Sequence, residues 1–251
     1  MRAIILGSGS KGNSTLLIGK NKKILIDVGF SYPKMLMNLK EYNLSPSDID
    51  AILITHTHKD HTLGLTTFVK KNNIFVYTNE KMLPEITKLV NEDMLKIMND
   101  EYSIGEFNIL AIHTSHDAVG SVGFIINDDT SNLVYVTDTG YINKTYLQKM
   151  INKDVYIFES NHDINMLMTG PYPYILKQRV LSDKGHLSNE LSGNYLKEII
   201  GDKTKRIILA HLSETNNTPD IALETVSGII DNDKIIIETA SQNESLDLGE
   251  I

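Results

Sequence analysis

The sequence contains no cysteine and no tryptophan among its 251 residues. Without cysteine, the chain can form neither a disulfide framework nor a cysteine-ligated zinc or iron–sulfur site. It also has no run of about 20 mostly apolar residues, the length that a membrane-spanning helix requires. The apolar stretch Ala3–Leu6 is far too short for a signal peptide. We therefore expect a cytoplasmic protein with no membrane partner.

The composition is otherwise that of a folded globular protein. Hydrophobic residues make up 41% of the chain and charged residues 22%, which excludes extensive disorder. The length allows one large domain or two small ones. Because the sequence shows no repeat, low-complexity tract or linker, we expect a single domain over residues 1–251, and its oligomeric state is open.

The charge is unevenly distributed along the chain. The formal net charge is −8, from 24 Lys and Arg against 32 Asp and Glu. The segment Ser213–Ile251 holds nine acids and one base, whereas Lys177–Arg206 holds seven bases and four acids. Binding of nucleic-acid phosphate depends on Lys and Arg. The acidic total therefore argues only against a loose, charge-driven coating of DNA and leaves a local basic site open.

Short runs rich in Ile, Val, Leu and Tyr predict buried strands. These runs are Ala3–Leu6, Thr15–Ile18, Lys23–Asp27, Ala51–Thr55, Ile74–Tyr77, Phe107–Ile112, Gly120–Ile126, Leu133–Thr137, Val155–Glu159, Arg206–Ala210 and Lys234–Glu238. Five segments between or after them predict helices: Tyr32–Tyr42, Lys81–Val90, Asn143–Ile151, Ser188–Ile200 and Pro219–Ile230. Strands mixed with helices predict an α/β (α+β) fold of two sheets with helices outside.

The most informative segment reads Thr-His-Thr-His-Lys-Asp-His from Thr55 to His61 and follows a predicted strand. In an extended chain, residues i and i+2 point to the same side, so His56 and His58 can aim at one ion. After a turn, Asp60 and His61 can reach a second point nearby. Imidazole and carboxylate groups suit Zn, Mn or Fe. The alternative interpretation is a solvated polar loop.

This segment resembles the HxHxDH signature of the metallo-β-lactamase superfamily. Four further motifs occur in the order that the family has: Leu25-Ile26-Asp27-Val28-Gly29, Ser115-His116-Asp117-Ala118, Val136-Thr137-Asp138-Thr139-Gly140 and Leu209-Ala210-His211-Leu212. The resemblance covers most of the chain and implies a four-layer αββα sandwich, in agreement with the pattern of strands and helices.

The resemblance also implies two bound divalent metal ions, and the candidate elements are Zn, Mn and Fe. Six side chains of these motifs become metal ligands, three for each ion: His56, His58 and His116 for the first, and Asp60, His61 and His211 for the second. Asp138 bridges the two ions together with a water or hydroxide, which becomes the nucleophile at neutral pH. Asp27 is expected to orient ligands rather than to bind metal.

Two features indicate the phosphodiesterase and nuclease branches of the superfamily. Gly185-His186-Leu187-Ser188 precedes a predicted helix and resembles their Gly-His-x-Ser/Thr motif. Glu159 ends a predicted strand and, by the same resemblance, partners His186, which would protonate the leaving alkoxide. With Asp60, these residues form the expected catalytic set. The alternatives are a helix-capping histidine and a charge at a strand end.

A Gly/Ser-rich loop, Gly7–Ser14, lies between the first two predicted strands. Alone it is weak evidence, but with the other motifs it resembles the WalJ/YycJ group, which implies a metal-dependent 5′→3′ DNA exonuclease. We expect six residues to contact substrate: Asn13, Ser14, Asn161, His162, Arg179 and Ser188. Arg179 could equally be a charge on a helix surface.

The sequence therefore predicts an enzyme, a dimetal hydrolase that cleaves phosphodiesters and has DNA as its substrate. Two alternatives stay open. One is a small-molecule phosphodiesterase of the same fold that acts on esters of the cyclic-nucleotide type. The other is a di-iron redox or sensor protein.

Overall fold

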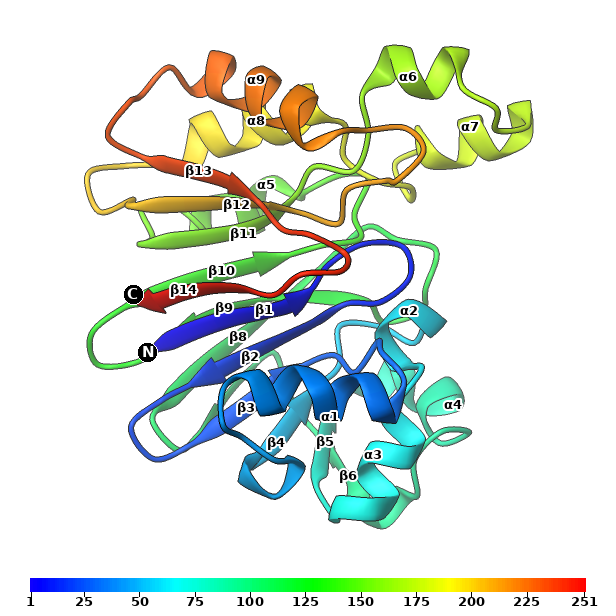
Figure 1. The fold of residues 1–251 in the computed structure, drawn as a ribbon, viewed down its shortest axis with the longest axis vertical. Coiled ribbons are helices and arrows are strands. Elements are labelled where there is room, and N and C mark those ends of the chain that lie inside the picture. Colours follow the sequence, from blue (N-terminus) through cyan, green and yellow to red (C-terminus); the bar gives the residue numbers. More distant parts are fainter.

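The computed structural model describes all residues from 1 to 251 and contains two seven-stranded sheets with helices on their outer faces (Figure 1). This arrangement confirms the predicted sandwich of two sheets and outer helices. The strand order is β14-β1-β2-β3-β4-β5-β6 in the first sheet and β13-β12-β11-β10-β9-β8-β7 in the second. The chain thus builds the first sheet, then the second, and returns to the first with its last strand.

Each sheet has an antiparallel part and a parallel part. The first sheet contains β1 Arg2–Gly7, β2 Ser14–Ile18, β3 Lys23–Ile26, β4 Ala51–Leu53, β5 Phe75–Thr78, β6 Leu95–Ile97 and β14 Leu246–Glu250. The second contains β7 Glu101–Ile104, β8 Phe107–His113, β9 Val122–Asn127, β10 Asn132–Val136, β11 Val155–Glu159, β12 Arg206–Ala210 and β13 Ile236–Thr239. Strands β3 to β6 are parallel to one another, and so are β10 to β13.

The helices lie on the outer faces of the sheets and at one end of the molecule (Figure 1). They are α1 Tyr32–Glu41, α2 Lys59–Thr62, α3 Leu65–Asn72, α4 Leu83–Ile86, α5 Lys144–Lys149, α6 Ile164–Thr169, α7 Tyr174–Val180, α8 Asn189–Ile199 and α9 Pro219–Ile230. Helices α8 and α9 pack together over the second sheet, while α6 and α7 project beyond it. None of the helices has the length and apolar character needed to cross a membrane.

Strands β11 and β12 of the second sheet have one face against the first sheet and the other against the outer helices. In β11, Ile157 belongs to the large core between the two sheets, whereas Phe158 belongs to a second core under the outer helices. In β12, Ile208 and Leu209 divide in the same way. Because successive side chains of a strand point to opposite faces, both faces of these parallel strands are apolar and buried. This double burial fixes the register of the strands.

The strand ends that face the polar loops carry unusual backbone conformations. Asp27 follows β3, Asp138 follows β10, and His211 follows β12, and their φ angles are 63°, 58° and 57°. Residues other than glycine rarely adopt this left-handed region, and where they do, the strain often accompanies a functional site. β3 belongs to the first sheet and β10 and β12 to the second, so the loops that follow these strands bring residues of both sheets to one end of the sandwich.

The structure differs from the sequence prediction in several elements. Strands β6, β7 and β14 and helices α2, α3, α6 and α7 were not predicted. The predicted helix Lys81–Val90 is instead a 3₁₀ turn, Glu80–Met82, followed by the four-residue α4. Pro84 stands at the start of α4 and has no N–H for a hydrogen bond to the preceding turn, so no continuous helix forms through it.

Gly29 lies where the loop after β3 meets α2 and the loop between β1 and β2. A Cβ atom at Gly29 would lie 1.8 Å from the carbonyl oxygen of Asp60 and 2.4 Å from the backbone nitrogen of Asn13. Two segments of backbone therefore approach this residue more closely than any side chain allows. Gly228 in α9 offers a contrast, because a Cβ atom there meets nothing within 4 Å.

We expect Gly29→Ala to destabilise the protein by at least the roughly 1–3 kcal/mol of an overpacked core, because two backbone segments must move apart. The matched change, Gly228→Ala, should stabilise it by about 0.5–1 kcal/mol, since it removes a glycine from a helix interior. Urea unfolding followed by circular dichroism measures both. Equal stability of Gly29→Ala and the parent protein would contradict the close approach.

Candidate metal centre

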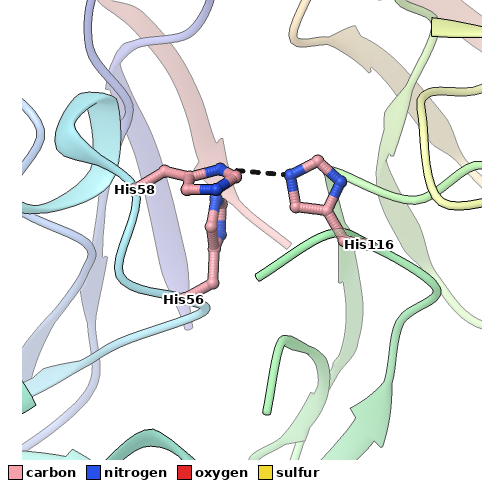
Figure 2. A group of neighbouring side chains, drawn as sticks. All are labelled: His56, His58 and His116. Carbon is pink, nitrogen blue, oxygen red and sulfur yellow. Dashed lines mark hydrogen bonds between the residues drawn. The ribbon is translucent and has the colours of Figure 1, made fainter. Parts of the chain in front are cut away.

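The first group of potential ligands comes from two loops. His56 and His58 lie in the extended segment between β4 and α2, and His116 lies in the loop between β8 and β9. The ligand atoms of these three side chains all lie within 4.8 Å of one another. Figure 2 shows the three rings converging, with His58 Nδ1 3.2 Å from His116 Nε2. Three imidazoles so placed can hold one metal ion.

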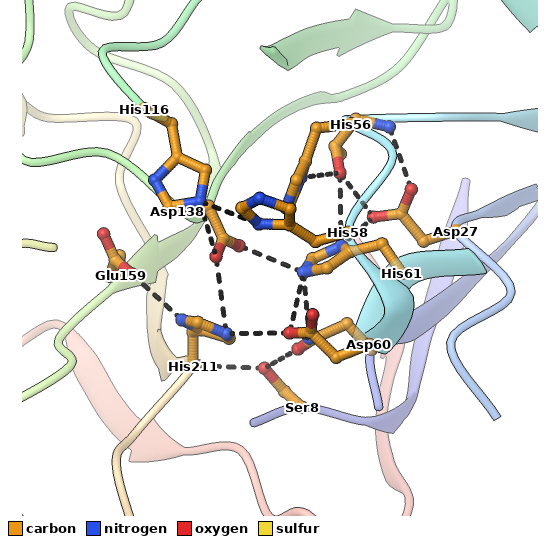
Figure 3. Close-up of polar contacts among 12 residues, drawn as sticks. Ser8, Asp27, His56, His58, Asp60, His61, His116, Asp138, Glu159 and His211 are labelled. Carbon is orange, nitrogen blue, oxygen red and sulfur yellow. Dashed lines mark hydrogen bonds and ion pairs between the residues drawn. The ribbon is translucent and has the colours of Figure 1, made fainter. Parts of the chain in front are cut away.

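The second group lies beside the first and draws on both sheets (Figure 3). Asp60 and His61 belong to α2, Asp138 follows β10, and His211 follows β12. His61 Nε2 lies 3.2 Å from Asp138 Oδ2, and His211 Nε2 lies 3.5 Å from both Asp60 Oδ2 and Asp138 Oδ1. Asp138 also lies 3.8 Å from His116 Nε2 of the first group. It is therefore placed between the two groups.

The donor atoms of these groups fit divalent metal ions. His56 Nε2 and His211 Nε2 are buried and make no hydrogen bond. A buried polar atom without a partner is costly, and both atoms point into the groups of converging donors. Imidazole nitrogen and carboxylate oxygen together suit Zn, Mn or Fe. The residues present thus satisfy the chemistry that a pair of such ions requires.

Two of the imidazoles are oriented from the first sheet. Asp27 is fully buried, and its Oδ2 lies 2.7 Å from His61 Nδ1. The backbone N–H and the hydroxyl of Thr55 donate to the same carboxylate, at 2.9 Å and 2.7 Å. The Thr55 hydroxyl oxygen also lies 3.1 Å from His56 Nδ1. The expected orienting role of Asp27 agrees with these contacts, and Thr55, the residue before His56, is a partner that the sequence reasoning missed.

Two further imidazoles are oriented by the loop before α8 and by the end of β11. His116 Nδ1 lies 3.3 Å from the carbonyl oxygen of Gly185, and His211 Nδ1 lies 3.0 Å from Glu159 Oε1. The same Oε1 atom lies 2.8 Å from His186 Nδ1. The other oxygen of Glu159 accepts hydrogen bonds from the backbone N–H groups of Thr139 and Leu187. One fully buried carboxylate thus holds His211 and His186 side by side.

The protonation states in the second group follow from its charges. Burial raises the pKa of Asp138, but the adjacent imidazoles of His211 and His61 outweigh burial and hold that pKa well below its usual range. Burial lowers the pKa of His211, and the surrounding carboxylates outweigh it and raise that pKa to about 10. Burial lowers the pKa of His56 in the first group. An ion that binds in the second group therefore displaces protons.

Two of the expected substrate contacts lie away from the open surface. Asn13 is fully buried, and its amide nitrogen lies 3.2 Å from Asp60 Oδ2 and 3.0 Å from His61 Nε2. Ser14 is also buried, and its hydroxyl donates to the carbonyl oxygen of Asp27. The side chains of Asn13 and Ser14 are buried from solvent and contact residues of the candidate ligand loop and its support. Their contacts support the loop around the candidate ligands rather than a molecule in solution.

Three other expected substrate contacts lie near the second group. The Asn161 amide donates to the His211 carbonyl oxygen at 2.8 Å. His162 is 1% exposed, and neither of its ring nitrogens has a hydrogen-bond partner. The Ser188 hydroxyl caps α8 by accepting from the Leu191 N–H. Of these three, only Asn161 lines the neighbouring cleft.

That cleft has a volume of about 260 Å³ and opens beside His116 and His186. Arg179 of α7 and Lys184 supply its positive charge, and Tyr172 lines it as well. Pockets for drug-sized ligands measure roughly 300–1,000 Å³, so this cleft is large enough for part of a substrate only. Sequence reasoning proposed Arg179 but missed Lys184 and Tyr172, although Lys184 lies two residues before His186 in the basic segment.

The comparisons with known proteins agree with this geometry. The sequence pattern of the family described as "Beta-lactamase superfamily domain" matches residues 22–212, and the chain belongs to that family. One relative is "Exodeoxyribonuclease WalJ" of Streptococcus pneumoniae, 39% identical over 229 residues, which are 88% of this chain and 85% of the relative. "Exodeoxyribonuclease YycJ" of Bacillus anthracis is 34% identical over 232 residues, covering 90% and 88%. The resemblance seen in the motifs is thereby confirmed.

Solved structures share the fold at low sequence identity. The metallo-beta-lactamase fold protein YhfI from Bacillus subtilis superposes with a TM-score of 0.75 at 18% identity and covers 98% of this chain and 100% of its own. The short form of human tRNase Z superposes with a TM-score of 0.67 at 16% identity, covering 98% of each chain. At these identities the likeness extends to the fold alone.

We expect Zn²⁺ or Mn²⁺ to raise the thermal unfolding midpoint and EDTA to reverse the rise. An ion that binds only the folded state stabilises it by about 2.7 kcal/mol at 100 times its Kd. Asp138→Asn should reduce the shift, because it alters the carboxylate that lies between the two groups. The control is Asp154→Asn. Asp154 is also buried, but it precedes β11, at the end of that strand away from Glu159 and the ligand groups. Scanning calorimetry measures the midpoints, and no shift with either ion would contradict the metal centre.

Proposed function

We propose that this chain is a metal-dependent phosphodiesterase that removes nucleotides from DNA, an exodeoxyribonuclease with 5′→3′ polarity. The observation that carries the proposal is the pair of ligand groups, with the Glu159–His186 pair beside them at the mouth of a basic cleft. Relatives at 34% and 39% identity that are named exodeoxyribonucleases support DNA as the substrate. The proposal also takes residues 1–251 as a single domain and the cytoplasm as the place where the enzyme works.

The proposal assigns one ion to each ligand group. His56, His58 and His116 would hold the first, and Asp60, His61 and His211 would hold the second. Asp138 would serve both ions, as its position between the groups favours. Zn²⁺ and Mn²⁺ are the ions proposed, with Fe as the further choice that the donor set allows.

Bound divalent ions lower the pKa of a water molecule towards neutrality and offset the negative charge that builds on the attacked phosphate. Asp60 is the proposed catalytic carboxylate of the second ligand group. Its carboxylate is 22% exposed and lies 3.4 Å from His61 Nε2 and 3.5 Å from His211 Nε2. These imidazoles hold its pKa well below the usual range despite burial, so the carboxylate is ionised and can bind a cation.

His186 is proposed to protonate the leaving sugar oxygen. Its side chain is 21% exposed, and its Nδ1 faces the buried Glu159 carboxylate at 2.8 Å. The opposite ring nitrogen is therefore left to face the cleft, whose walls include His186. Its ring centroid lies 5.2 Å from the rings of both His116 and His211. A proton donor this close to both ligand groups can reach an oxygen that leaves the phosphate.

The direct test uses purified protein that has been freed of metal and reloaded with Mn²⁺ or Zn²⁺. We expect it to release nucleotides from linear duplex or single-stranded DNA labelled at either end, and to leave closed circular DNA intact. The end label that is lost first reports the polarity. Hydrolysis of a cyclic nucleotide without any degradation of DNA would favour a small-molecule phosphodiesterase. A redox-dependent iron spectrum without phosphodiesterase activity would favour a sensor protein.

We expect His186→Ala to lower the turnover number about 10²- to 10⁴-fold, the usual contribution of a general acid, with metal content unchanged. The control is His113→Ala, because His113 also faces a carboxylate, Asp100 at 3.3 Å, but belongs to neither ligand group. Steady-state kinetics and elemental analysis of the same samples measure both quantities. Loss of metal from His186→Ala would show that His186 is a ligand rather than a proton donor.

A further inference from the structure

The candidate ligand imidazoles share a common arrangement in which one ring nitrogen faces the metal centre and the other faces an orienting group. In four of the five, the orienting group is a hydroxyl, a carboxylate or a carbonyl oxygen. The pairs are Thr55 with His56, Asp27 with His61, Gly185 with His116 and Glu159 with His211. His58 is the fifth. Its Nδ1 lies 3.2 Å from His116 Nε2 inside the first ligand group, and its Nε2 points outwards, 3.4 Å from Asp117 Oδ1. Asp117 thus occupies the place that the orienting groups occupy elsewhere.

Asp117 is itself held from α7. The Arg179 Nε atom donates to Asp117 Oδ2 at 2.7 Å, and a terminal nitrogen of the same guanidinium forms an ion pair with that oxygen. The pairing leaves Asp117 Oδ1 clear of the guanidinium, and this oxygen lies 3.4 Å from His58 Nε2 and 3.5 Å from His116 Nε2. Arg179 was proposed from the sequence as a partner for phosphate or a surface charge, and the structure places two of its donor nitrogens on this carboxylate.

We propose that Asp117 is the positioning residue for His58 and that Arg179 fixes Asp117, so that helix α7 braces the first ligand group from the wall of the cleft. This inference rests on the metal assignment of the proposed function. Partners of this kind orient a ligand ring, set its tautomer and raise its basicity, and their loss typically weakens metal binding by about 10- to 100-fold.

The position of the pair also gives Arg179 a second task. The Arg179 side chain is 59% exposed and that of Asp117 is 30% exposed, and both line the cleft. Without the guanidinium, a carboxylate would face an incoming phosphate with uncompensated negative charge. The planar guanidinium has five N–H donors, so those not used by Asp117 remain available to the substrate. Arg179 therefore acts on the metal centre and on substrate binding at once.

The first measurement is the Zn²⁺ dissociation constant, obtained by competition with a chromophoric chelator and independent of activity; steady-state kinetics on DNA is the second. We expect Asp117→Ala to bind Zn²⁺ about 10- to 100-fold more weakly than the parent. Asp117→Asn should fall between the two, because its amide oxygen can still accept from His58 Nε2 but carries no charge. Arg179→Gln should weaken binding less than Asp117→Ala and should also raise the KM for DNA.

The matched control is Asp247→Ala, which breaks an exposed Arg–Asp pair of the same kind, with Arg2, outside both ligand groups. It should leave Zn²⁺ affinity unchanged, and circular dichroism checks that every variant is folded. Parent affinity in Asp117→Ala would overturn the positioning role, and parent affinity in Arg179→Gln would overturn the bracing by α7. If the parent protein itself binds no Zn²⁺, Mn²⁺ or Fe²⁺, the metal assignment fails and this inference fails with it.

Discussion

The hydrogen bond between Asp27 and His61 is the interaction on which the rest of the site depends. Both side chains are fully buried, and their atoms lie 2.7 Å apart. A buried carboxylate is tolerable only when its hydrogen bonds are made, and Asp27 makes them to His61 and to Thr55. These contacts hold the exit of β4, and with it His56 and His58, against the end of β3. The left-handed backbone of Asp27 is the conformation that this arrangement imposes.

In the second sheet, Glu159 plays the part that Asp27 plays in the first: a buried carboxylate at a strand end that contacts imidazoles. Its buried carboxylate ends β11, accepts backbone N–H groups from two neighbouring loops, and holds two imidazoles. Each sheet therefore contributes one buried carboxylate at a strand end, and each carboxylate orients histidines towards the other sheet. The ligand groups form where these two supports face each other. A shift of one sheet relative to the other would separate Asp138 from His61 and open the centre.

The sequence predicted the parts of this arrangement that are local. His56 and His58 share one side of an extended segment, and that follows from the period of two alone. The eleven apolar runs also became strands, since short runs of Ile, Val and Leu are typical of buried strands. Helix α7 escaped prediction because its exposed apolar residues, such as Tyr174 and Ile175, give no one-sided pattern. The cleft wall that it forms was therefore not visible in the sequence.

The chain by itself determined which residue types are available and the order of its motifs, because these are properties of neighbouring residues. Only the tertiary structure decided which of them meet. Asn13 and Ser14 looked like substrate contacts in a Gly/Ser loop, yet the fold buries them against Asp60 and Asp27. Arg179 looked like a free cation, yet it pairs with Asp117, 62 residues away in the chain. Contacts between distant segments depend on how two sheets stack, and no local pattern encodes that stacking.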